Sequence, residues 1–204
     1  MSRLASLSPA ALKAMFSTDS DDTLIAGMTL SGTSIAQPIR LCDGYTHKFE
    51  WLTSTSMTVT TLSTGAASAF AYAAGDAVLQ AAVNADPANA LYGVMSGTVP
   101  FLFLPFQLTL PTEEEAAPRC SVTIHDVTRL MVPVLRTITS APSVGIDLVL
   151  ASTPSVVEAS FPGFKMGAIS YSAESISAEL TVDSLATEPF PAHTFTPSSF
   201  PGLF

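Results

Sequence analysis

Apolar and polar residues alternate in short runs along this chain, which is the pattern of strands that bury one face. Residues 106–110 read Phe-Gln-Leu-Thr-Leu, so every second side chain is apolar. Residues 119–127 alternate in the same way, with apolar side chains at Cys120, Val122 and Ile124. The two runs predict a hairpin whose connection carries three consecutive glutamates and is an acidic surface loop.

Further segments have the alternating or β-branched character of strands. Asp43 and Gly44, between two of them, are a turn pair that predicts a tight hairpin. Residues 161–163 (Phe-Pro-Gly) predict a turn that splits another segment. The predicted strand segments are residues 23–31, 37–42, 47–52, 57–62, 143–151, 156–171 and 175–185.

Two segments predict short helices. Ser8 is suited to the N-cap of a helix over residues 8–16, and Pro9 is suited to its first helical position. Residues 126–140 repeat apolar side chains at helical spacing, although Pro133 shortens or bends that helix.

These elements predict a mainly β, β-rich α+β fold of about eight short strands with two short helices. Turn signals recur at strand-length intervals, which favours a β-barrel or β-sandwich body. We assign the body to residues 1–188. Residues 65–97 interrupt the pattern with an alanine-rich stretch, which we interpret as an insertion or long loop.

Residues 189–204 form a separate C-terminal arm in this interpretation. They carry no charge, and Phe190, Phe195 and Phe200 recur every five residues before Phe204. Four prolines in the same segment oppose a helix or a central strand, so the arm is expected to be extended. Four phenylalanines need burial, either along the arm's own body or on another subunit. We favour an intermolecular contact in which they are the interface anchors.

Composition favours an oligomer. Charged residues make up 12% of the 204 residues, about half the usual share, and hydrophobic residues make up 48%. A large core would explain this composition, and so would an extensive subunit interface, where charge is depleted. The net charge of −9, with no basic residue between Lys48 and Arg119 or after Lys165, argues against nucleic acid as a partner.

No targeting or membrane-spanning segment is expected. No run of about eighteen apolar residues is present, so the sequence predicts no membrane span. The first residues lack the basic and apolar parts of a signal peptide, so we expect synthesis in a cytoplasm.

The sequence contains no specific catalytic or metal-binding motif, so it predicts neither an enzyme nor a bound cofactor or metal. Cys42 and Cys120 each lie in an apolar run and are expected to be buried, reduced thiols. His47, His125 and His193 are dispersed along the chain.

Two polar pairs near the second predicted helix have alternative interpretations. His125-Asp126 is better explained by an N-capping aspartate than by catalysis. Arg129 and Arg136 share one face of that helix. They are candidate interface residues that pair with acidic groups of a neighbouring subunit, or they keep the face solvated.

The order of these pieces resembles an uncharacterised family of minor tail proteins of long-tailed, non-contractile bacteriophages, of the tail-tip and baseplate type. The terminal pattern, with Phe-Thr-Pro-Ser-Ser-Phe-Pro-Gly-Leu at residues 195–203, is the most specific match. The other matching pieces are residues 8–16, 23–30, 37–43 (Gln-Pro-Ile-Arg-Leu-Cys-Asp), 104–111 (Leu-Pro-Phe-Gln-Leu-Thr-Leu-Pro), 121–130 (Ser-Val-Thr-Ile-His-Asp-Val-Thr-Arg-Leu) and 188–191 (Glu-Pro-Phe-Pro).

The resemblance implies a structural subunit of the virion tail tip. Such a subunit forms part of a three-fold or six-fold ring, of the distal-tail or hub type, between the tail tube and the central fibre or hub. Its partners would be copies of itself and other tail proteins: the tail tube, the hub or central fibre, and the tape measure.

A carbohydrate- or host-surface-binding β-sandwich module is the alternative, and a small tail-tip hydrolase is a weaker one. A sugar-binding module needs exposed aromatic platforms, for which the chain offers Trp51 and four tyrosines.

Overall fold

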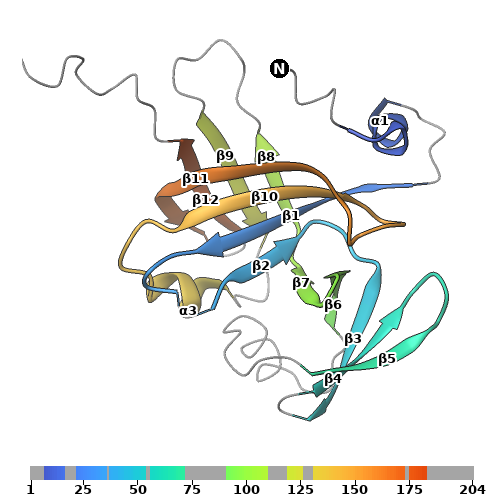
Figure 1. Ribbon diagram of the computed structural model, residues 1–204. Coiled ribbons are helices and arrows are strands. Elements are labelled where there is room, and N and C mark those ends of the chain that lie inside the picture. The colour runs from blue at the N-terminus through green and yellow to red at the C-terminus, as the bar shows by residue number, and fades with distance from the viewer. Residues whose placement is uncertain are drawn as a thin grey trace, which may run out of the picture.

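The strands of this protein form a single sheet (Figure 1). The computed structural model describes residues 7–16, 22–35, 37–53, 56–71, 91–109, 119–125, 131–172 and 175–182. The strands are β1 (Leu24–Ser31), β2 (Ile39–Cys42), β3 (His47–Thr53), β4 (Ser56–Thr61), β5 (Ala67–Ala71), β6 (Leu91–Ser96), β7 (Val99–Phe103), β8 (Phe106–Thr109), β9 (Arg119–His125), β10 (Ser143–Leu150), β11 (Val157–Tyr171) and β12 (Ser175–Val182). The helical segments are α1 (Pro9–Phe16) and α3 (Met131–Arg136).

The mainly β prediction is confirmed. The sheet has 12 strands in the order β5-β4-β3-β6-β7-β2-β1-β10-β11-β12-β9-β8, so about eight was too few. The order is that of one open sheet, and the expected closed barrel or sandwich is not confirmed. The pairing is antiparallel throughout except between β2 and β7, which run parallel.

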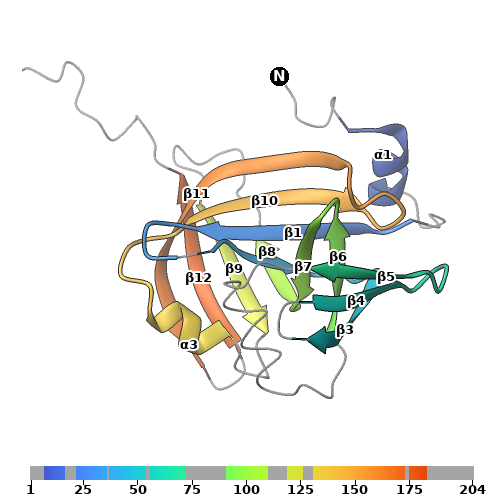
Figure 2. The same ribbon diagram turned by 60° about the horizontal axis from the view of Figure 1, so that its bottom comes forward.

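The sheet curls because residues 104–105 form backbone hydrogen bonds to strands in both halves of the sheet. Residues 104–105 join β7 to β8; the Leu104 N–H donates to the Cys42 carbonyl (3.0 Å), and the His125 N–H donates to the Pro105 carbonyl (2.8 Å). Along these two residues the chain therefore changes its hydrogen-bonding partner from the end of β2 to the end of β9. Pro105 has no N–H to donate, which suits the point where the chain changes partner. Figure 2 shows β12 and β9 turning down from the layer of β1, β10 and β11.

The main core lies inside this curl. Met28, Leu41, Val122 and Leu180 are fully buried there, and Leu135 of α3 packs against the same cluster. Strands β8, β9 and β12 contribute alternate residues to it, as the sequence pattern predicted for 106–110 and 119–127. Strand β1 is buried on both faces, which explains its nearly continuous apolar sequence Leu-Ile-Ala-Gly-Met-Thr-Leu.

Strands β3 to β6 form a smaller unit beside the curl, which we call the flap. Its core is Phe49, Met57 and Val59, with Phe70 packed against them. Residues 65–71 and 91–97 were interpreted as part of a loop, which is wrong: they contain β5 and β6. The alanines of β5 carry little strand signal, so pairing with β4 and not propensity places them in the sheet. Residues 72–90 lie outside the described part.

Two predicted turns are also wrong. Asp43-Gly44 does not connect paired strands, because β1 and β7 occupy both edges of β2 and leave none for β3. The Asp43 carboxylate instead accepts a hydrogen bond from the Ala26 N–H (2.7 Å), which extends the pairing with β1. Pro162 and Gly163 do not split β11. They form a bulge in it, where Gly163 has a φ of 89°.

Helix α1 begins as predicted. The Ser8 hydroxyl accepts a hydrogen bond from the Ala11 N–H (3.1 Å), which is the N-cap contact. The Ser8 N–H donates to the Glu158 carboxylate (3.0 Å) and so ties the helix to β11. The helical segment α3 covers six residues in the middle of the predicted segment 126–140, whose first five residues lie outside the described part and whose last four are not helical, so the prediction of two helices is not confirmed. The arm, residues 189–204, also lies outside it.

Gly93 is the glycine whose replacement should damage the fold most directly. A Cβ there would lie 2.0 Å from the Phe101 carbonyl oxygen and 2.6 Å from the Phe49 ring. We expect Gly93→Ala to lower the free energy of unfolding by about 3 kcal/mol, because backbone atoms of β7 must move. Gly145→Ala is the matched control, since nothing lies within 4 Å of that Cβ position. Urea unfolding curves with equal midpoints for both variants would contradict this packing.

Candidate binding groove

A groove with a volume of about 620 Å³ opens at the end of the molecule where β10 leads into β11. It lies among three connections that are distant in sequence. Its wall residues are Asp22, Tyr45, Thr46, His47, Thr61, Leu62, Ser63, Ala151, Ser152 and Pro154. Most of these side chains are hydroxyls or apolar groups, so the groove suits a largely uncharged ligand.

Backbone hydrogen bonds fix two of the three walls to each other. The Thr46 N–H donates to the Gly93 carbonyl (2.9 Å), and the Leu62 N–H donates to the Thr46 carbonyl (3.0 Å). The β4–β5 turn is closed by Gly65, which donates to the Thr61 carbonyl (2.8 Å) and has a φ of 68°. The walls from β2–β3 and β4–β5 therefore form one connected surface.

Asp22 holds the third wall. Its Oδ1 accepts from the Ser152 N–H (3.1 Å), and its Oδ2 accepts from the Ser152 hydroxyl (2.5 Å). The Ala151 N–H donates to the Thr23 carbonyl (2.9 Å), which continues the pairing of β1 with β10. The carboxylate is thus engaged in positioning the β10–β11 connection.

Tyr45 lines the groove and belongs to an aromatic cluster whose other rings, Tyr92 and Phe103, are not among the wall residues. The Tyr45 ring is 5.2 Å from the Tyr92 ring at an angle of 56°, and 5.0 Å from the Phe103 ring at 69°. These are the tilted and edge-to-face arrangements that aromatic pairs prefer. Tyr45 and Tyr92 are nevertheless 51% and 40% exposed. We call this cluster and the adjoining cavity the tyrosine groove.

His47 is the titratable group in the groove with a perturbed pKa. Its Nδ1 shares a hydrogen bond with the Thr46 hydroxyl (2.7 Å). Partial burial lowers the pKa of the imidazole, because the charged form loses hydration there. The neutral ring is therefore the form that the folded groove favours.

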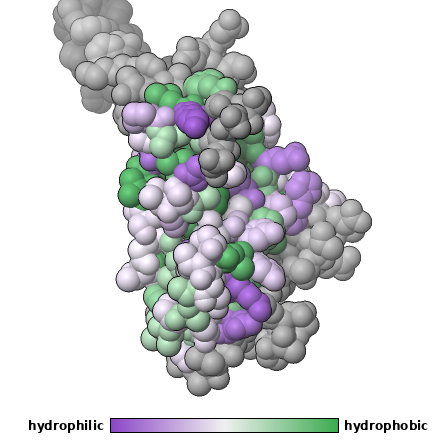
Figure 3. All heavy atoms as spheres, turned by 90° about the vertical axis from the view of Figure 1, so that its right-hand side faces the viewer, coloured by the Kyte–Doolittle hydropathy of each residue, from purple (hydrophilic) through white to green (hydrophobic). Residues whose placement is uncertain are grey.

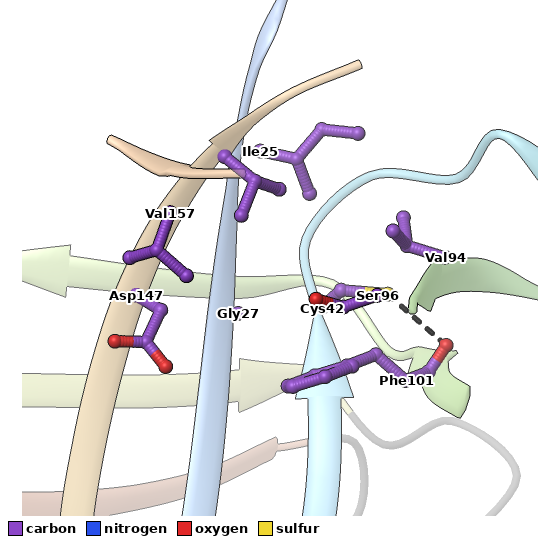
Figure 4. A pocket seen from close by; sticks show the side chains of 9 residues that line it. Ile25, Gly27, Cys42, Val94, Ser96, Phe101, Asp147 and Val157 are labelled. Carbon is purple, nitrogen blue, oxygen red and sulfur yellow. Dashed lines mark hydrogen bonds between the residues drawn. The ribbon is translucent and has the colours of Figure 1, made fainter. Parts of the chain in front are cut away.

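A second, much smaller hollow lies on the outer face of β1 (Figure 4). Its volume is about 30 Å³, enough for one or two water molecules. Gly27 lies between Phe101 and Asp147 here, and the Ser160 hydroxyl donates to the Asp147 carboxylate (2.6 Å). The hollow is mostly apolar and too small for a cofactor.

The cysteines are free and buried, as predicted. The Cys42 thiol borders the small hollow and donates to the Phe101 carbonyl (3.4 Å). Burial raises the pKa of Cys42 to about 12, and it also raises the pKa of Cys120. Neither thiol is an activated nucleophile, because both favour the protonated form.

The described part of the chain contains one of the six predicted interface residues. Arg136 is exposed in the last turn of α3 and does not border the tyrosine groove. Arg129 and the anchors Phe190, Phe195, Phe200 and Phe204 lie outside the described residues. Their roles stay predictions.

The histidines are not brought together by the fold. His125 ends β9 opposite Ser175, whereas His47 begins β3. Asp126 and His193 lie outside the described part. Within the part of the chain that the structure describes, no three His, Cys, Asp or Glu side chains gather where they could hold a metal ion. None of the described helices has the length and apolar character needed to cross a bilayer.

The sequence analysis missed the aromatic cluster. Its three members come from β7, β6 and the β2–β3 connection, and the pairings β2–β7 and β3–β6 bring them together. Aromatic residues next to a turn pair (Gly44-Tyr45) and beside a strand glycine (Tyr92-Gly93) were the available signal. That signal identifies exposed rings but not their mutual contact.

The groove end of the molecule shows mixed surface chemistry. Figure 3 views this side, and hydrophobic and hydrophilic residues are intermixed across it without one dominant apolar area. Leu62, Val156 and Val157 are nevertheless 45%, 54% and 49% exposed here. Isolated apolar side chains between polar ones are ordinary on a protein surface and do not by themselves identify a binding site.

Compared with models of known protein families and with curated protein sequences, the chain matches none.

His47 should make the stability of the fold depend on pH. Because its folded pKa is below the ordinary value of 6.5, its contribution is present above that pH and is lost as the pH falls through the folded pKa. We expect the free energy of unfolding of the wild type to fall more steeply below pH 6.5 than that of His47→Gln, which cannot take up a proton. Urea unfolding at several pH values measures both slopes, and parallel slopes would contradict the prediction.

Proposed function

We propose that this protein is a structural subunit of a bacteriophage tail tip. It contributes to a ring of the distal-tail or hub type that joins the tail tube to the central fibre or hub. The sequence resemblance is the starting point, and the mainly β body is compatible with it. The protein acts in the virion in this proposal, through contacts and not through catalysis.

The observation that carries the proposal is the end strand β5. It pairs with β4 in a regular register and has no partner on its other edge among the described residues. Its sequence Ala-Ser-Ala-Phe-Ala contains no charge and no proline. Natural sheets protect their edges with lysine, proline or bulges, because an open edge recruits another strand. An unprotected edge suits a subunit that meets a neighbour.

We also propose that the curled part of the sheet serves as a barrel-like wall. The partner change at residues 104–105 supports this role, because β7 and β8 follow each other and pair with the two halves of the curl. The curl itself is filled by the main core, so in this proposal the channel lies between the bodies of the assembled ring. The net charge of −9 of the whole chain would repel DNA phosphates and let the genome pass.

The arm completes the proposed assembly. Burial of each phenylalanine of residues 189–204 on a neighbouring subunit would contribute about 1.5–3 kcal/mol. Ring contacts are heterologous, so each subunit offers one surface to the next and receives another from the previous subunit. Three or six such contacts close a ring.

The number of copies tests the function directly. Native mass spectrometry of the full chain, together with the number of copies in each purified tail, should give three or six. A stable monomer that is missing from assembled tails would overturn the proposal.

Removal of residues 189–204 should separate folding from assembly. In this proposal residues 189–204 act through contacts with a neighbouring subunit, so we expect an unchanged thermal unfolding midpoint with loss of the oligomer. The control is the full chain with Ser198→Ala and Ser199→Ala, which keeps all four phenylalanines. Truncated chains that enter tails normally would show that the arm is not a clamp.

A further inference from the structure

The tyrosine groove exposes an aromatic ring beside a cavity. Tyr45 contacts Tyr92 and Phe103, yet half of its surface is exposed. Aromatic side chains contribute most when they are covered, so a ring held by its neighbours at the wall of a groove can cover a ligand. The groove is also lined by hydroxyl groups, from Thr46, Thr61, Ser63 and Ser152.

We propose that the tyrosine groove binds the C-terminal segment, residues 189–204, of a neighbouring copy of this chain. The inference rests on the proposed function, in which that segment binds a neighbouring subunit and so acts as a clamp. It identifies the surface of the neighbour that the segment binds.

The chemistry of the segment matches the groove. Proline-rich segments bind aromatic-lined grooves in an extended conformation, where their rings stack on tyrosines at little cost in conformational entropy. Residues 189–204 contain four prolines and four phenylalanines. An extended backbone of this kind leaves its carbonyl groups free, and the hydroxyls of Thr61 and Ser63 in the groove can donate to them.

Charge supports the same occupant. The segment has no charged residue, so it can leave water without losing the hydration of an ion. Asp22 is already engaged with Ser152, and the lowered pKa of His47 favours a neutral ring. The groove therefore presents little unsatisfied charge to a ligand and favours an uncharged one.

The topology separates the start of the segment from the groove, and the contact between copies follows from the proposed ring, because the segment is long enough to reach either body. The segment follows Val182, which pairs with Phe164, and Phe164 pairs with Val144 at the start of β10. The groove borders Ala151, just beyond the end of the same strand. The two positions are roughly 20 Å apart at about 3.3 Å per residue. They lie at opposite ends of the body in Figure 1, with β12 on the left and the groove connections on the right.

Opposite placement is what a repeating assembly requires. When the binding segment and the groove that it occupies lie at opposite ends of one subunit, each copy can bind the next in the same head-to-tail contact. Residues 183–204 span up to roughly 70 Å when extended, at about 3.1 Å per residue, so they can reach the next body.

Cross-linking in the full-length protein tests the contact. A photoreactive phenylalanine derivative replaces Phe195, and ¹⁵N-labelled and unlabelled chains are mixed before assembly. We expect cross-links from the segment of one isotope to groove peptides around Tyr45, Leu62 or Pro154 of the other. Tyr45→Ala should reduce their yield about tenfold, as expected for the loss of one aromatic contact.

Matched variants control the experiment. Tyr45→Phe keeps the ring and should cross-link like the wild type. Tyr171→Ala removes a tyrosine of similar exposure (43%) away from the groove and should also leave the yield unchanged. Thermal unfolding of each variant shows whether the fold is intact.

Each contrary outcome identifies what is wrong. If Tyr45→Ala changes nothing while removal of residues 189–204 dissolves the oligomer, the groove assignment is overturned and the clamp stands. If neither change has an effect, both fail. Cross-links confined to one isotope overturn the contact between copies and indicate an intramolecular strap. Tyr45-dependent binding to a neutral oligosaccharide array, without cross-links, overturns the inference in favour of a sugar site.

Discussion

The curl of the sheet depends on residues 104–105, which form backbone hydrogen bonds to both halves of the sheet. Leu104 donates to β2 and the Pro105 carbonyl accepts from β9, while Leu104 and Phe106 enter the main core. Without this change of partner, no hydrogen-bonded segment would hold β8 and β9 next to β2, and the apolar faces of β1 and β12 would not meet. The buried cluster, the position of α3 and the separation of the flap all follow from it.

The sequence predicted elements well where one face of a strand is buried. Residues 106–110 and 119–127 alternate because β8 and β9 cover one side of the main core. The prediction failed where pairing depends on distant segments. Asp43-Gly44 has the composition of a hairpin turn, but the neighbours of β2 come from β1 and β7. Pro162-Gly163 has the composition of a turn, but β10 pairs with Phe161 before it and with Phe164 after it, which makes it a bulge.

The candidate site was not predictable for the same reason. No part of the tyrosine groove is contiguous in sequence, and Tyr45, Tyr92 and Phe103 meet through two pairings that local patterns do not contain. The low charge of the chain was informative in a different way, because it indicated surfaces for partners without locating them. The two surfaces that we propose for partners, the edge of β5 and the groove, come from the flap and its junction with the curl.

The separate small core of the flap has a consequence for motion. In the sheet, the flap is joined to the curl through the four residue pairs between β6 and β7, and it is stabilised by a cluster of three buried side chains, Phe49, Met57 and Val59. Local unfolding follows the weakest cooperative unit of a protein, so the flap should open and close while the main core stays folded. In the assembly that we propose, such a subunit would combine a stable body with a margin that can move, and small differences in spacing between neighbouring subunits could be taken up at that margin while the body stays folded.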